Sequence, residues 1–512
     1  RFNVQTSFLL CIPMRRSLLA ILLLLTGFSA RANFEFNEKV SEAYTSIIRL
    51  RLDQGQQLLR DEKFRHPGNR IVILYENYID FLKAFISENE IAFLELKKRS
   101  TQRLKQLDES SSGEQSPWYL YAKAEIIVQE ALLRVKFREH VTAANQMRKA
   151  WKLIERNEAL YPTFVLNRKL SGFLHTVVGA VPKEYHWLVD LAGMEGTIPQ
   201  GVEELNTLLR MLQGSELEPY REEILFYLGN IRLSFYSGND PDEGLLSQLD
   251  PYVFWSPLLR YSTVSIRMRA GRNDDALQLL TRHYPDTFTY AFPFLTYKRG
   301  LARLRKLDLG AESDFRAFLN QYKGMNYVRA AWQKLAWIQL LKGDPDGYRQ
   351  VIQTCRTTGD QLVDEDKEAF SEALGGDPPN KLLLRARLLF DGGYYDEAQD
   401  VIAGKPIDSF PRYRDQLEVT YRLARILQRQ GQEAKAIEYY ETTLKNGSSA
   451  RYYFAANSAL SLGNLYEEKG DLQRALTYYQ RCLALDHHEY QNSIDQKAQA
   501  GLDRIAEALE KQ

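Results

Sequence analysis

The sequence predicts an all-α fold built from repeated pairs of antiparallel helices. Near the C-terminus, two segments share a spacing in which glycine precedes alanine by five residues and alanine precedes tyrosine by four. Glycine-led turn clusters recur along the chain, between segments whose apolar residues are three and four positions apart. No alternating strand pattern or hairpin signal competes with these helices. The two copies of the spacing are Gly431, Ala436, Tyr440 and Gly470, Ala475, Tyr479.

This spacing is typical of the tetratricopeptide repeat, a helix–turn–helix unit of about 34 residues. Small residues are required where the two helices of a unit come closest, and Ala424 and Gly463 occupy that position in the first helices. Glycine in the turn adopts a left-handed conformation at little steric cost. We therefore expect a tetratricopeptide-type solenoid, with clear repeats over residues 381–512 and a polar-backed capping helix over 494–509 that closes the stack.

The N-terminal residues have the pattern of an export signal. The basic residues Arg15 and Arg16 precede an unbroken apolar run at 18–25, and a small-residue cleavage site ends at Ala32. The pattern predicts a signal segment over residues 1–32, with translation starting at Met14 and cleavage after Ala32. An uncleaved N-terminal anchor is the alternative. The expected location is periplasmic or secreted.

Residues 33–374 are predicted to form a more divergent array of helical repeats. Two turn glycines in the central part of the chain, Gly271 and Gly393, again precede an alanine by five residues, at Ala276 and Ala398. The cluster at 375–379 combines two glycines and two prolines, which favour a turn over a helix. We expect this cluster to separate the divergent array from the C-terminal repeats.

Residues 164–210 contain an apolar helix, a proline turn, a leucine-rich helix and a turn with spaced glycines. Here the sequence resembles the tetratricopeptide repeat 39 family, which includes the inclusion-body clearance protein. The resemblance implies an all-helical repeat protein with no known catalytic residues. The residues that carry it are Ser171-Gly172-Phe173-Leu174, Val177-Val178-Gly179-Ala180-Val181, Pro182, Trp187-Leu188-Val189-Asp190-Leu191-Ala192-Gly193, Gly196, Gly201, Leu205 and Leu208.

The apolar stretch at 170–189 also allows a second interpretation, in which a hairpin makes the protein membrane-peripheral. Its largely apolar run at 170–181 is shorter than the roughly 20 residues that cross a bilayer. A run of this length is more typical of a buried core helix. Membrane association is therefore the less favoured alternative.

The composition and motifs give no sign of an enzyme. A formal net charge of +1 removes any overall electrostatic argument for nucleic-acid binding. None of the seven histidines has a metal-binding spacing, and no phosphate-binding or dinucleotide loop is present. We therefore predict no catalytic site, metal or cofactor. Two alternatives concern cysteines: a Cys–His hydrolase built on Cys355, and a disulfide between Cys355 and Cys482.

The first helices of tetratricopeptide pairs line the concave face of a solenoid, and we predict that this face binds a protein or peptide. The position after the close-contact residue is Arg387, Arg425 and Asn464 in three successive repeats. Arg422 and Arg429 lie three and four residues from Arg425, so they share its face. Arginine forks bind carboxylates bidentately, which suggests an acidic segment or free C-terminus as the partner. The alternative is a solvated charged face.

Overall fold

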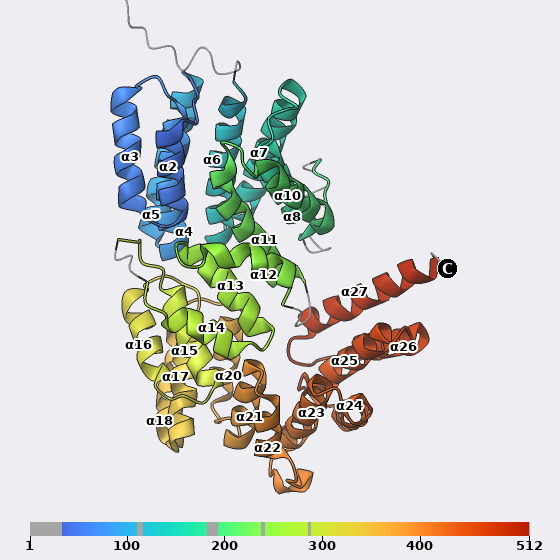
Figure 1. Cartoon of the computed structure of the whole chain (residues 1–512). Helices are drawn as coiled ribbons and strands as arrows, with labels where there is room; N and C mark the ends of the chain where they lie inside the picture. Colours follow the sequence, from blue (N-terminus) through green and yellow to red (C-terminus); the bar gives the residue numbers. More distant parts are fainter. Residues whose placement is uncertain (1–32, 110–115, 182–192, 237–240, 285–287, 511–512) are drawn as a thin grey trace, which may run out of the picture. The chain divides into compact units, whose positions relative to one another are not determined.

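The computed structural model describes residues 33–109, 116–181, 193–236, 241–284 and 288–510 (Figure 1). The predicted signal segment lies outside these residues. Within them, every regular element is a helix, apart from one isolated parallel bridge between Asn33 and Asn69. The fold is the predicted all-α, tetratricopeptide-type repeat of helix pairs.

The chain forms two compact units. The first comprises Arg1–Ile86 with Glu90–Ile224, and the second comprises Ser87–Asn89 with Leu225–Gln512. The turn cluster at 375–379 does not coincide with this division. Within the second unit, α21 (Lys381–Gly392), which follows the cluster, packs against α15 (Phe294–Arg305) and α17 (Val328–Lys342), which precede it. Helices separated by that cluster thus share one compact unit.

In the first unit, α2 packs against α3, α6 against α7, and α8 against α10. A buried aromatic cluster joins several of these helices, and Tyr44 lies 4.4 Å from Tyr220 between ring centroids. The helices are α2 (Glu38–Ile48), α3 (Leu52–Arg65), α4 (Ile71–Ser87), α5 (Glu90–Asp108), α6 (Pro117–Lys136), α7 (His140–Leu160), α8 (Asn167–Gly179), α10 (Ile198–Leu212), η3 (Glu218–Tyr220) and α11 (Arg221–Phe235), the last of which continues into the second unit.

In the second unit, successive pairs follow the repeat pattern, with α13 on α14, α15 on α16, α17 on α18, α21 on α22, α23 on α24 and α25 on α26. The helices are α12 (Glu243–Leu249), η4 (Asp250–Tyr252), α13 (Pro257–Arg269), α14 (Asn273–Thr281), α15 (Phe294–Arg305), α16 (Ala311–Gln321), α17 (Val328–Lys342), α18 (Pro345–Ile352), α19 (Thr354–Thr357), α20 (Asp364–Gly375), α21 (Lys381–Gly392), α22 (Tyr395–Ile402), η5 (Ile407–Ser409), α23 (Tyr413–Arg429), α24 (Glu433–Gly447), α25 (Phe454–Glu468), α26 (Leu472–Leu483) and α27 (Gln491–Glu510).

The glycine–alanine spacing has the structural role that the sequence predicts. The four turn glycines all have positive φ, between 74° and 85°. The four alanines that follow them are completely buried, because each lies where the second helix of a pair meets the first. The glycines are Gly271, Gly393, Gly431 and Gly470, and the alanines are Ala276, Ala398, Ala436 and Ala475.

The predicted capping helix is α27, and a single tyrosine explains how it closes the stack. Tyr479 is fully buried, between Gly463 of α25 and Gly501 of α27. A Cβ atom added to Gly463 or Gly501 would lie 2.5 Å or 2.4 Å from the tyrosine ring. Glycine at both positions therefore lets the two helices approach one aromatic ring closely.

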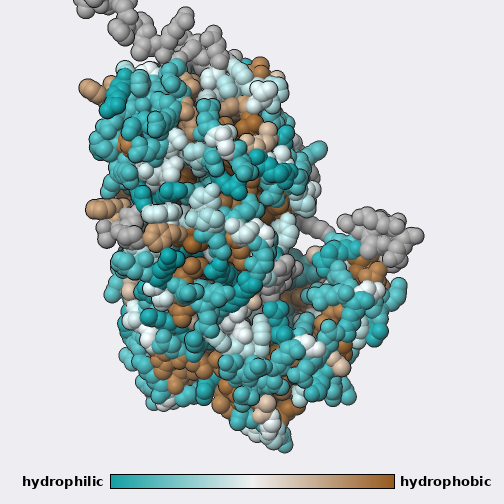
Figure 2. Space-filling model, viewed as in Figure 1, coloured by the Kyte–Doolittle hydropathy of each residue, from teal (hydrophilic) through white to brown (hydrophobic). Residues whose placement is uncertain are grey.

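The described part of the apolar stretch at 170–189 is a packed helix. Leu170, Leu174 and Val178 of α8 are buried, and α8 packs against α10 and α7. A Cβ on Gly201 of α10 would lie 2.3 Å from the carbonyl oxygen of Gly172, so the two helices touch through their backbones. Residues 182–189 lie outside the described part of the chain. Among the helices that are described, none combines the length and apolar character needed to cross a bilayer, and hydrophilic residues predominate on the face in Figure 2.

Candidate partner-binding cavity

The second unit contains a cavity of about 680 Å³, which we call the repeat cavity. Its walls come from α17, α20, α21, α23, α25 and α27, and from the turns before α21, α23, α25 and α27. Four of these helices are the first members of repeat pairs. The repeat cavity is thus lined by the helices that the sequence analysis assigned to the concave face.

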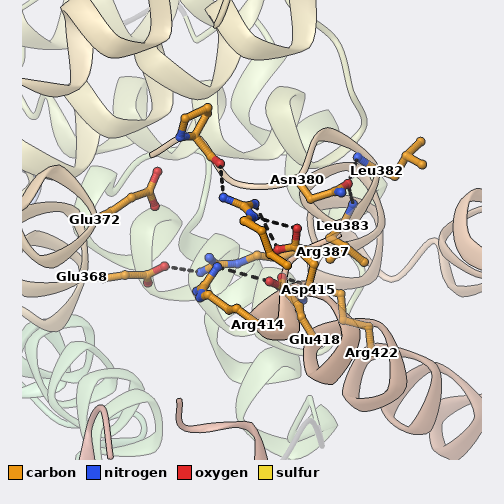
Figure 3. A network of polar contacts seen from close by, with 12 residues as sticks. Glu368, Glu372, Asn380, Leu382, Leu383, Arg387, Arg414, Asp415, Glu418 and Arg422 are labelled. Carbon is orange, nitrogen blue, oxygen red and sulfur yellow. Dashed lines mark hydrogen bonds and ion pairs between the residues drawn. The ribbon is translucent and has the colours of Figure 1, made fainter. Parts of the chain in front are cut away.

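An ion pair crosses the repeat cavity between α20 and α21 (Figure 3). Arg387 Nη2 donates to Glu368 Oε1 at 2.5 Å, and its guanidinium lies 5.0 Å from the ring centroid of Trp337. Burial opposes the charge on both partners, but their mutual attraction is stronger. It lowers the pKa of Glu368 and raises the pKa of Arg387. The pair is therefore fully ionised at neutral pH.

A second set of charges runs along α23, on three residues spaced by four. Glu418 accepts hydrogen bonds from both Nε and Nη2 of Arg422, with Nε at 2.8 Å. Arg414 Nη1 reaches the other oxygen of Glu418 at 3.4 Å. Burial disfavours the charged carboxylate, but Arg422 and Arg414 outweigh it and lower the pKa of Glu418. Glu418 thus holds two arginines at the wall of the cavity.

The start of α23 is fixed by Arg412, the residue before the helix. Its guanidinium pairs with Asp415 at 2.8 and 3.0 Å, and it donates at 3.1 Å to the carbonyl oxygen of Pro378. Pro378 belongs to the turn cluster at 375–379. The contact therefore ties that cluster to α23 and closes one side of the cavity.

Glu372 of α20 lines the repeat cavity and joins α20 to α17 and α18. It accepts hydrogen bonds at 2.7 Å from the side chains of Gln333, Trp337 and Tyr348. Tyr348 lies five residues after the turn glycine Gly343, where the other repeats have a buried alanine. Glu372 and Tyr348 were not predicted from the sequence, although the aromatic residue in the alanine position is a departure from the repeat that the sequence shows.

The opposite wall is aromatic and includes one carboxylate. Tyr453 and Tyr490 meet edge to face, with ring centroids 5.5 Å apart. Tyr490 has a left-handed backbone, with φ of 61°, and 45% of its surface is exposed. Its neighbour Glu489 has a raised pKa. Burial, with smaller contributions from the carboxylates of Glu418 and Glu368, outweighs the attraction of Arg414 and a hydrogen bond from the backbone of Tyr453. A left-handed non-glycine residue stores backbone strain, which often marks a functional position.

The five predicted binding residues do not form one column. Arg387 and Arg422 line the repeat cavity. Arg425 instead lies over the ring of Phe390, at 4.2 Å from its centroid, and Arg429 donates to the hydroxyl of Tyr395 at 3.0 Å. The side chain of Asn464 accepts a hydrogen bond from Tyr479 at 2.7 Å.

Helix geometry explains this correction to the predicted face. Arg425 is turned about 60° around the helix axis from Arg422, and Arg429 lies about 10 Å farther along the axis. The stripe that lines the cavity continues from Arg422 toward the start of α23, through Glu418 and Arg414.

The two cysteines of the described residues are not activated as nucleophiles. Cys355 and Cys482 are both buried and unbridged. The thiol of Cys355 donates to the carbonyl oxygen of Arg329, and burial, followed by the nearby charge of Glu372, raises its pKa to about 12. A catalytic thiolate needs the opposite shift. Among the described residues, no group of three potential ligands is placed to hold a metal ion.

The first unit contains a different polar network, which we call the buried lysine cluster. Lys169 of α8 is fully buried and donates to Glu223 at 2.8 Å and to the hydroxyl of Tyr78 at 2.7 Å. It also lies 3.0 Å from Glu125. Tyr44 adds a hydrogen bond to Glu223 at 2.5 Å. Five helices, α2, α4, α6, α8 and α11, thus place one cation, two carboxylates and several hydroxyls in the protein interior.

The charges of the buried lysine cluster are unequal, because two carboxylates share one cation. Burial lowers the pKa of Lys169, but the attraction of Glu125 and Glu223 is larger and raises it. Burial and repulsion by Glu223 raise the pKa of Glu125, and Lys169 only partly offsets them. The lysine is therefore held in its charged form, whereas Glu125 is held toward its neutral form.

Comparison with known protein families identifies repeats in the C-terminal part of the chain. Residues 415–486 match the tetratricopeptide repeat family. No curated protein matches the chain. Among solved structures, the crystal structure of the APC/C hetero-tetramer Cut9-Hcn1 is similar at 10% sequence identity and a TM-score of 0.26, over 87% of this chain and 86% of that chain.

Proposed function

We propose that this protein is a non-catalytic scaffold that binds an extended segment of a partner protein in the repeat cavity. The observation that carries the proposal is the cavity itself, with a volume of about 680 Å³ and walls from several repeats. Ligand-binding cavities commonly measure about 300–1,000 Å³. Tetratricopeptide solenoids expose such concave surfaces because each repeat is slightly rotated from its neighbour.

The sequence motivates two narrower parts of this proposal. The signal pattern before Asn33 supports export to the periplasm or the medium. The arginines on the first helices support an acidic partner segment or C-terminus. However, Arg387 and Arg422 already pair with Glu368 and Glu418, so an acidic segment would have to displace these carboxylates. The resemblance of residues 164–210 to the tetratricopeptide repeat 39 family also stays a prediction.

Filling the repeat cavity tests the binding proposal. Ser371 of α20 and Ser493 of α27 line the cavity and are exposed, so Ser371→Trp and Ser493→Trp should occupy its volume without disturbing the core. Gln480→Trp, on the exposed surface of α26 outside the cavity, is the matched control. Immobilised wild-type protein and the three variants would be incubated with the exported fraction, and captured proteins identified by mass spectrometry.

We expect one protein to be retained by the wild type and by Gln480→Trp, and lost from both cavity variants. Equal retention by all four proteins would exclude the repeat cavity as the binding site. Export is tested separately by mass spectrometry of the N-terminus, which should begin at Asn33. A mature protein that keeps residues 14–32 would contradict cleavage after Ala32.

A further inference from the structure

We infer that the segment bound in the repeat cavity places a basic side chain against the wall formed by Tyr453, Glu489 and Tyr490. This inference rests on the proposed function, since it names the chemistry of the occupant. It reverses the expectation of an acidic segment, because the arginines of the cavity are already paired with carboxylates and Glu489 is not paired with a cation.

The arginines of the cavity are largely neutralised by carboxylates of the same unit. Arg387 pairs with Glu368, and Arg422 pairs through two nitrogens with Glu418. Arg412, which opens α23, is bound through two nitrogens to Asp415. An acidic ligand would have to break such bonds before it gained new ones, which removes most of its electrostatic benefit.

The carboxylates are less completely paired. The lining residues include six carboxylates and five cations, so acidic groups are in excess. The three donors to Glu372 are neutral side chains. Glu489 accepts a hydrogen bond from the backbone of Tyr453 but forms no ion pair with any described residue. The cation that acts on it is Arg414, which is bonded to Glu418. Charge complementarity therefore favours an incoming cation at Glu489.

The surroundings of Glu489 also suit a cation. Burial and the nearby carboxylates of Glu418 and Glu368 raise its pKa, because they disfavour the charged form of Glu489. A basic group of the ligand would stabilise that charged form. The rings of Tyr453 and Tyr490 stand at this wall, and Tyr490 is 45% exposed. Lysine and arginine bind favourably over aromatic rings. The left-handed backbone of Tyr490 holds its ring at this position at a conformational cost, as expected for a contact residue.

Three blocked pentapeptides that differ only at the central residue test the inference. The probes carry lysine, glutamine or glutamate between flanking alanines, and their affinities would be measured by isothermal titration calorimetry. We expect the lysine peptide to bind at least about fivefold more tightly than the glutamine peptide, and the glutamate peptide to bind most weakly. Glu489→Gln and Tyr490→Ala should each remove most of the lysine preference. Glu468→Gln, on the exposed surface of α25, is the control and should retain it.

The possible results separate this inference from the proposed function. Three results would contradict the inference that a basic side chain binds at this wall: equal affinities of the peptides, tighter binding of the glutamate peptide, or no binding of any peptide. The proposed function would still stand if the native partner were lost from Ser371→Trp and Ser493→Trp. A lysine preference that persists in Glu489→Gln and Tyr490→Ala would also overturn the inference, because the cation would then bind elsewhere.

Discussion

The buried lysine cluster and the Arg387–Glu368 pair of the repeat cavity use the same kinds of chemical group at different degrees of burial. In the cluster, Lys169, Glu125 and Glu223 are enclosed by protein, and tyrosine hydroxyls complete their hydrogen bonds. In the cavity, Arg387 and Glu368 keep more than a quarter of their side-chain surface exposed. Separating a fully buried ion pair leaves charges in the protein interior without a partner, which is costly, whereas a partly exposed pair is close to water and can rearrange around a ligand at lower cost. We therefore expect the cluster to contribute to stability, and we propose the cavity as the place of binding.

The largest difference should appear when a cation is removed from each network. Lys169→Met leaves two carboxylates buried without their cation, and we expect it to lower the free energy of unfolding by about 3–5 kcal/mol. Arg387→Met breaks a partly exposed pair and should cost about 1 kcal/mol. Urea denaturation measures both changes, with the exposed Arg210→Met as control. Equal losses in Lys169→Met and Arg387→Met would remove the distinction between the two networks.

Removing one tyrosine hydroxyl from the buried lysine cluster and one from the repeat cavity compares the two networks with a smaller change in each. The hydroxyl of Tyr78 donates to Glu125 at 2.8 Å and accepts a hydrogen bond from Lys169. Tyr78→Phe should therefore cost about 3 kcal/mol, the upper range for hydrogen bonds to charged groups. Tyr453→Phe in the cavity should change the free energy of unfolding by less than about 0.5 kcal/mol. Thermal denaturation measures both changes, and equal decreases in the melting temperatures of the two variants would contradict this expected difference in stability.

The two networks should also respond to pH in opposite directions. The folded state lowers the pKa of Glu418, so this group adds stability above its unfolded pKa and loses it as the pH falls through the folded pKa. The folded state raises the pKa of Glu125, so that contribution is present below the unfolded pKa and is lost as the pH rises through the folded value.

Neutral substitutions make this difference measurable. Between pH 3 and pH 7, Glu418→Gln should become more destabilising relative to the wild type, reaching about 1.5 kcal/mol. Over the same range, Glu125→Gln should become less destabilising. Urea denaturation at several pH values gives both trends. Parallel trends for the two variants would show that the carboxylates experience similar environments.

The smallest effects are expected at the predicted residues that lie outside the repeat cavity. Arg425→Met keeps an alkyl chain over Phe390 and removes only the cation–π attraction, worth about 0.5–1 kcal/mol of stability. Retention of the native partner should change less than about twofold, the amount expected from a surface change that leaves the binding site intact. If partner binding depended strongly on Arg425, the binding site would be the face predicted from the sequence and not the repeat cavity.

The repeat architecture could be predicted because its determinants are local. Glycine, alanine and tyrosine at fixed spacings set the turn and the closest helix contact within one pair, so Gly470 and Ala475 identify a repeat without knowledge of distant residues. Gly501 shows the limit of this reasoning. It accommodates the ring of Tyr479 from a separate helix, and no repeat spacing links the two positions.

The charge network of the cavity was harder to predict because its partners lie far apart in sequence. Glu368 and Arg387 face each other from different helices, and Glu372 gathers donors from α17 and α18. The arginines were recognisable as cations on first helices, but the carboxylates that neutralise them were not. Without those carboxylates, the sequence suggested a site for acidic ligands, whereas the structure favours a basic one.

Site-specific photo-cross-linking tests the central claim, that the partner enters the repeat cavity, most directly. Benzoylphenylalanine would replace Ser371 or Ser493 at the cavity, or Gln480 on α26, in otherwise wild-type protein. Irradiation with the captured partner should give strong cross-links from both cavity positions and little or none from Gln480. Cross-linking that is strongest at Gln480, or absent from both cavity positions while the partner stays bound, would contradict the account.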